Sequence, residues 1–150
     1  MTGLYSLLTQ IKDLLEADVN VNSVSFGNVF ELDLNKQSIY PISHFSVGTA
    51  QSIGYANRFS ITVISMDIVD VSKSEGQLTF EGNNNEIDVL NTQFHVQARL
   101  VELLQRSPLL VKLVIADEVN YESFTDRFQD AVAGWTLTFD VDIPKDMTIQ

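Results

Sequence analysis

An unbroken alternation of apolar and polar residues runs through Trp135-Thr136-Leu137-Thr138-Phe139-Asp140-Val141-Asp142-Ile143. Successive side chains of a β-strand point to opposite faces, so this pattern predicts a strand with one apolar face and one polar face. Pro144 is expected to end the strand, because proline has no backbone N–H to donate to a neighbour. Strands of this kind are typical of antiparallel sheets that are covered on one side.

A second strong strand signal extends from Arg58 to Val71. Its apolar residues occupy one phase in the first half and the other phase in the second half: Phe59, Ile61 and Val63, then Ile64, Met66 and Ile68. A phase shift of one residue indicates either a β-bulge or a strand with apolar contacts on both faces.

Weaker strand signals lie on either side of these two. Residues 19–26 and 29–34 are predicted to form a hairpin around the Gly27-Asn28 turn signal. Residues 39–47 predict a third strand, in which Pro41 indicates an edge position or a bulge. Beyond Pro108 we expect a strand over 111–115, a second strand-like or irregular piece through Phe124, and a short turn or helix over 126–132.

Two segments have the period of an amphipathic helix. The first follows the i, i+3, i+4, i+7 rule and ends near Ala17, with the apolar stripe Leu4, Leu7, Leu8, Ile11, Leu14 and Leu15. The second runs from Asn85 to about Arg106 and has two apolar stripes: Ile87, Leu90, Phe94, Ala98, Val101 and Leu104, and Val89, Val96, Leu100 and Leu103. A helix that is apolar on two sides is covered either by the sheet and the first helix or by a neighbouring subunit.

The predicted order of elements is α-β-β-β-β-α-β-β, without an internal repeat or a linker. We therefore expect residues 1–150 to form a single α+β domain, with a mostly antiparallel sheet packed against two main helices. Residues 49–57 are predicted to be an exposed loop or an extended hairpin arm, and residues 73–85 a long polar loop.

Composition excludes several classes of function. The chain has 150 residues, no cysteine and a formal net charge of −11. The missing cysteines exclude disulfide scaffolds and thiolate metal sites, and the acidic balance argues against a surface that binds phosphate backbones. No targeting segment or membrane span is recognised, so we expect the chain to fold inside a cell and not to associate with a membrane.

Catalytic signals are weak. His44 and His95 are the only histidines, and their spacing does not predict a zinc site. Asp67 and Asp70 lie three residues apart on a predicted strand and therefore on opposite faces. Nucleotide-binding and nucleophile-elbow motifs are absent. We predict no catalytic, cofactor or metal residues and no enzyme activity; a small hydrolase that uses His44 or His95 stays the least favoured alternative.

Several short strings together resemble one protein family: Val24-Ser25-Phe26-Gly27, Asp33-Leu34-Asn35-Lys36-Gln37 with Ile39-Tyr40-Pro41, Ser65-Met66-Asp67-Ile68-Val69-Asp70, Asn85-Glu86-Ile87-Asp88-Val89-Leu90-Asn91, and Phe124-Thr125-Asp126-Arg127-Phe128 with Gly134-Trp135-Thr136. The chain resembles tail-terminator or tail-completion proteins of tailed bacteriophages, in particular those of Bacteroidota phages, including crAss-like phages. The resemblance spans about residues 4 to 148. It implies an α+β subunit of a homo-oligomeric ring, commonly a hexamer, around the DNA channel at the tail end or neck. It brings no catalytic or cofactor residues.

This resemblance leads to specific expectations about partners. The chain would be a virion protein that is assembled in the host cytoplasm, contacts copies of itself and tail-tube and connector proteins, and surrounds passing DNA without binding it specifically. Its acidic residues would line the channel, so that DNA is repelled. The expected subunit-interface residues are Arg127, Trp135, Phe94, Val96, Leu100 and Leu103.

Each of these expectations has an alternative. Arg127 could instead form an ion pair within the subunit, and Trp135 could belong to its core. The alternative for the whole chain is a monomeric binding or accessory module that docks to a partner protein through the 48–57 loop.

Overall fold

Strand β6 (Val132–Pro144) organises the sheet in the computed structural model, which describes residues 3–27, 40–69, 86–106, 114–115, 119–125 and 132–144. One edge of β6 pairs along its whole length with β3 (Ala56–Ile68). Its other edge pairs with both β4 (Val114–Ile115) and β5 (Asn120–Thr125). These pairings are antiparallel, and the alternation over 135–143 correctly predicted the strand.

The described strands form one six-stranded sheet in the order β1-β2-β3-β6-β4, with β5 beside β6. β1 (Ser23–Phe26) pairs in parallel with β2 (Ile42–Ile53), and all other pairings are antiparallel. Together with two helices, the mostly antiparallel sheet gives the predicted α+β fold. The parallel pairing was not predicted. Residues 29–34, 73–85 and 126–131, for which a strand, a loop and a turn or helix were expected, lie outside the described residues.

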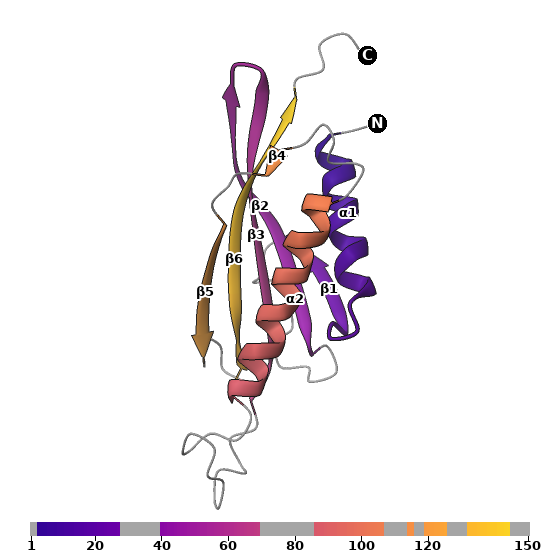
Figure 1. Ribbon diagram of the computed structural model, residues 1–150, viewed down its shortest axis with the longest axis vertical. Coiled ribbons are helices and arrows are strands. Elements are labelled where there is room, and N and C mark those ends of the chain that lie inside the picture. Colours follow the sequence, from indigo (N-terminus) through magenta and orange to yellow (C-terminus); the bar gives the residue numbers. More distant parts are fainter. Residues whose placement is uncertain are drawn as a thin grey trace, which may run out of the picture.

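Strands β2 and β3 form a long hairpin that extends beyond the helices at the upper end of Figure 1. A two-residue turn, Gly54-Tyr55, joins Ile53 to Ala56. Gly54 has a φ of 65°, a left-handed conformation that glycine adopts without steric cost. Of the two predictions for residues 49–57, the hairpin arm is confirmed.

The phase shift in β3 reflects contacts on both faces of the strand. Ile61 and Val63 face the helices, whereas Met66 lies in a second apolar cluster with Ile42. The register between β3 and β6 is uninterrupted. The bulge lies instead in β2, where two residues, Gly48 and Thr49, stand between the pairs Val47–Ile61 and Ala50–Phe59.

Helices α1 (Leu4–Ala17) and α2 (Glu86–Arg106) lie side by side on one face of the sheet (Figure 1). The apolar stripe of α1 contributes Leu7, Ile11 and Leu15 to the main core. α2 contributes its own buried side chains to the same cluster: Val96, Leu100, Val101 and Leu104. α2 is therefore covered by the sheet and by α1, which was one of the two arrangements that its double stripe predicted.

Polar contacts fix the position of α2. The amide nitrogen of Gln97 donates to the carbonyl oxygens of Val63 (3.0 Å) and Trp135 (2.8 Å). Arg99 donates two hydrogen bonds, of 2.9 and 2.8 Å, to the carboxylate of Asp18 just after α1. Paired arginine–carboxylate bonds are directional, so this ion pair helps to hold α2 beside the end of α1.

Pro41 lies just before β2, and β2 is an interior strand between β1 and β3. The prediction that Pro41 marks an edge strand or a bulge is therefore wrong. Because Pro41 precedes the first residue of the strand, its missing N–H removes no hydrogen bond from the sheet. Its carbonyl oxygen accepts hydrogen bonds from the backbone N–H groups of Asn22 (2.7 Å) and Ser23 (3.1 Å) at the start of β1.

The ion pair between β3 and β6 predicts a pH dependence of stability. Arg58 donates to both carboxylate oxygens of Asp142 (2.7 and 3.0 Å), and this holds the pKa of Asp142 below its ordinary value of 3.8. A carboxylate whose pKa is lower in the folded state stabilises the fold above its unfolded pKa and loses that contribution as the pH falls through its folded pKa. Urea unfolding of wild type and Asp142→Asn should therefore differ most near neutral pH, and the difference should shrink below pH 3.8.

Asp13→Asn is the control, because it removes an exposed carboxylate of α1 and the same unit of charge. It should not reproduce this pH profile. A difference between wild type and Asp142→Asn that stays constant with pH would contradict the assignment.

Candidate interaction surface

An apolar groove opens where the first turns of α2 pass over the start of β6. Its volume is about 350 Å³, and its lining is mostly apolar: Ile87, Leu90, Asn91, Phe94 and Trp135. Ile87, Leu90 and Phe94 share one face of α2 because they follow helical spacing. Ile87 is 43% exposed, although it belongs to an apolar stripe. This part of the stripe extends past the core to the surface.

Two aromatic rings, Phe94 and Trp135, line this groove, and a third, Tyr121, packs against Phe94. The ring centroid of Phe94 lies 5.3 Å from that of Trp135 on β6 and 4.8 Å from that of Tyr121 on β5. The indole N–H of Trp135 donates to the carbonyl oxygen of Leu90 (2.8 Å). Burial raises the pKa of the Tyr121 phenol above its ordinary value of 10.0, and a phenol is neutral at physiological pH even without this shift. The groove is therefore a fixed, uncharged aromatic surface and not a loose patch.

The structure brings two of the predicted interface residues together and separates the others. Phe94 and Trp135 meet in the groove. Val96 and Leu100 are 1% and 2% exposed and pack within the main core of the subunit. Leu103 is 45% exposed on α2 but does not line the groove. Arg127 lies outside the described residues.

Ile87 and Leu90 also line the groove, and Tyr121 supports its Phe94 ring, although no interface role was predicted for these residues. Ile87 and Leu90 share the apolar stripe of Phe94, and that stripe was the signal that could have identified them. Tyr121 had no such signal, because its partner lies on α2, far away in the sequence.

The two histidines are in different surroundings. Nε2 of the buried His44 lies 2.6 Å from the carbonyl oxygen of Gly27, and its Nδ1 lies 2.6 Å from the hydroxyl of Ser25. A carbonyl oxygen only accepts, so Nε2 carries a proton, and in the neutral ring Nδ1 then accepts from Ser25. His44 thus ties β1 to β2. The exposed His95 interacts within its own helix, with Nδ1 2.8 Å from the carbonyl oxygen of Asn91.

The tip of the β2–β3 hairpin is the second exposed feature. Residues 48–52 are exposed, and the large ring of Tyr55 is exposed at the turn. Ala56 and Asn57, at the base of the turn, still pair with Pro144 and Ile143 of β6. The arm is therefore braced by a third strand along its β3 side.

Across the described ranges, no group of three or more His, Asp or Glu side chains is arranged to hold a metal ion. The helices within those ranges lack the combination of length and hydropathy that a membrane crossing requires. No protein-family model matches the chain, and a search of curated proteins finds no match.

Proposed function

We propose that this protein is a structural subunit of a tailed-phage virion, which assembles with copies of itself into a ring at the tail end or neck. The half-open aromatic groove of Ile87, Leu90, Phe94 and Trp135 carries the proposal. Exposed apolar surface that is rigid and contiguous is typical of protein–protein contacts, in which aromatic side chains supply much of the binding energy. The resemblance to tail-terminator proteins supplies the biological setting.

Two further features support assembly. Within the described strands, β5 pairs only with β6, and its Tyr121 packs against Phe94 of the groove. The hairpin arm extends away from the helices and could contact an adjacent ring or connector (Figure 1). The net charge of −11 suits a subunit that surrounds DNA without holding it, because bound DNA requires Lys and Arg to neutralise its phosphates.

Self-association should depend on the groove. Ile87→Asp places a carboxylate at the exposed rim of the groove, where a neighbouring subunit would bury it without a partner. We expect the dissociation constant of the assembly to rise at least about tenfold, equivalent to about 1.4 kcal/mol. Light scattering after size-exclusion chromatography over a concentration series measures this change, and negative-stain microscopy of wild type should show rings with a central channel.

Val19→Asp is the matched control, because it introduces the same charge at an exposed apolar residue outside the groove. It should leave the association unchanged. Leu103→Asp tests whether Leu103, an exposed residue of α2 that was also predicted at the subunit interface, contributes to self-association. A wild-type protein that is monomeric at every concentration, with no rings, would contradict the proposal.

The hairpin arm favours a second candidate, a monomeric module that docks to one partner protein. Its exposed tip and its bracing by β6 suit insertion into a partner's surface. The same scattering series separates the two candidates, because this one requires a monomer. Flanking portal, tail-tube or sheath genes would favour the virion ring.

A further inference from the structure

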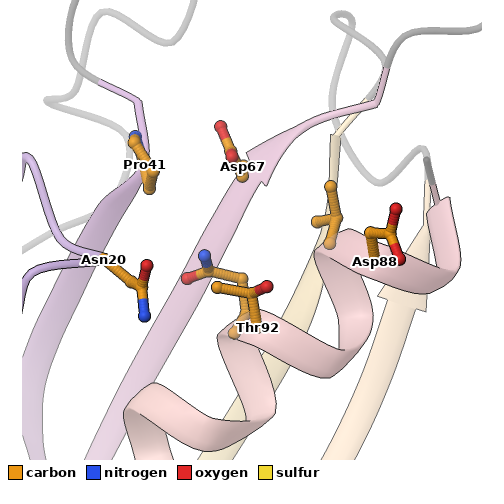
Figure 2. A pocket seen from close by; sticks show the side chains of 7 residues that line it. Asn20, Pro41, Asp67, Asp88 and Thr92 are labelled. Carbon is orange, nitrogen blue, oxygen red and sulfur yellow. The ribbon is translucent and has the colours of Figure 1, made fainter.

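A small polar pocket lies on the other side of α2 from the aromatic groove. Figure 2 shows Asn20 and Pro41 on one side and Asp88 and Thr92 on the other, with Asp67 between them near the end of β3. Val89 and Gln93 complete the lining, and the volume is about 200 Å³. The pocket and the groove share no lining residue, so the inference below is independent of the proposed assembly.

Gln93 is the feature that points to a ligand. Its side chain is 1% exposed, and neither its amide oxygen nor its amide nitrogen has a hydrogen-bond partner among the residues that the structure describes. Gln97, one turn further along α2, donates from its amide nitrogen to two carbonyl oxygens and leaves only its amide oxygen without a partner, whereas in Gln93 both atoms lack one. Buried polar groups are normally paired, because each unpaired donor or acceptor destabilises the fold. A group in the pocket that both donates and accepts would pair both atoms of Gln93.

Asp67 adds a second acceptor to the lining of the same pocket. One of its carboxylate oxygens accepts the N–H of Ile68 (2.7 Å), and the side chain is half-buried. Burial raises its pKa, so its surroundings do not favour a free negative charge. The seven lining residues include the carboxylates of Asp67 and Asp88 but no Lys, Arg or His. An N–H donor of the ligand would therefore meet acceptors and no competing cation.

We propose that this pocket binds a primary carboxamide group. The carbonyl oxygen of the ligand would accept from Nε2 of Gln93, one of its N–H groups would donate to Oε1 of Gln93, and the other would donate to Asp67. Pockets for drug-sized molecules usually measure about 300–1,000 Å³, so this smaller pocket suits an end group and not a whole large ligand. The source is either the side chain of Asn or Gln from a second copy of this chain or a free small amide.

Fragment titration followed by NMR tests the proposal. The side-chain NH₂ resonance of Gln93 should shift saturably with acetamide, with a dissociation constant of about millimolar order, as expected for so small a fragment. Three fragments lack part of the required chemistry and should give little or no shift: N,N-dimethylacetamide has no N–H, acetate has no donor, and methylguanidinium has no acceptor. The NH₂ resonance of Gln97 is the internal reference, because its hydrogen bonds lie within the protein.

Two variants test whether the NMR shifts with acetamide come from binding in this pocket. Gln93→Met keeps the length of the side chain, removes both unpaired atoms, and should weaken acetamide binding at least about tenfold while leaving the thermal midpoint equal or higher. Binding in this variant is followed through the backbone amide of Thr92. Gln10→Met is the matched control, because Gln10 lines another pocket of about 200 Å³ on α1. It should bind acetamide like wild type.

Three results would overturn the proposal. The first is no response of Gln93 to acetamide. The second is an equal response to methylguanidinium or acetate. The third is a large loss of stability in Gln93→Met, which would mean that the amide already has a partner.

If acetamide binds, spectra of the protein without added ligand identify the source of the carboxamide. A shift of Gln93 with protein concentration assigns the amide to a second copy of the chain, and a constant resonance assigns it to a free small molecule.

Discussion

Phe139→Ala is expected to lower the free energy of unfolding by about 3–5 kcal/mol, the usual cost of deleting a buried phenylalanine. Phe139 is 2% exposed, lies in β6 opposite Ile61 of β3, and belongs to the main core beneath α2. The substitution removes apolar contacts with the sheet and with the helices, and the cavity cannot close without moving a central strand. Chemical denaturation followed by circular dichroism measures the loss.

Tyr5→Ala is the control for this prediction. It also replaces an aromatic residue with alanine, but Tyr5 is exposed on α1. Surface substitutions usually change stability by about 0.5 kcal/mol or less. Because whole domains are stable by only about 5–15 kcal/mol, Phe139→Ala removes a large share of the total. Similar losses in the two variants would contradict the position of the core.

Gly134→Ala is expected to destabilise the protein by about 3 kcal/mol or more, at the upper end of overpacking effects. A Cβ atom at Gly134 would collide with the carbonyl oxygen of Ser65 and lie 2.8 Å from Cα of Met66. Both obstacles are backbone atoms of the adjacent strand β3, which cannot rotate away as a side chain could. The strands would have to separate where Gly134 pairs with Met66 on one side and Phe124 on the other.

Gly48→Ala is the matched control, because it adds the same methyl group to the same sheet. The nearest atom to a Cβ at Gly48 is the carbonyl oxygen of Ser60, at 3.7 Å, an ordinary van der Waals contact. Thermal melts of the two variants should therefore differ strongly, with Gly48→Ala close to wild type. A small effect of Gly134→Ala would contradict the close approach of β3 and β6.

Local patterns predicted local structure well. The alternation through Phe139 and Val141 identified β6 because the period of a strand depends only on neighbouring residues. The parallel pairing of β1 with β2 could not be found in the same way. Partner and direction depend on how the chain returns to the sheet, and no local pattern contains that information. Pro41 was likewise interpreted inside a strand that begins only after it.

The surface sites were harder to predict than the fold. Phe94, Val96 and Leu100 are all apolar residues of α2, but Val96 and Leu100 pack in the core whereas Phe94 lines the groove. Each stripe is covered over only part of its length, and which part is covered depends on where α1 and the sheet lie, which no helical period contains. The burial of Gln93 was not predicted either, because Gln93 is polar. A glutamine within a helix is normally taken for a solvated residue, and only the packing of α2 on the sheet buries it.

At the bulge of Gly48 and Thr49, the alternation of β2 side chains between the two faces of the sheet shifts by one residue. The hairpin therefore has an inner and an outer section. Odd-numbered residues of β2, such as Val47, share a face with Ile61 before the bulge, and even-numbered residues, such as Ala50, share that face with Phe59 after it. The outer section can therefore lengthen or shorten by residue pairs at the turn without changing which side chains reach the core. The length and sequence of the tip can thus change during evolution independently of the sheet that supports it.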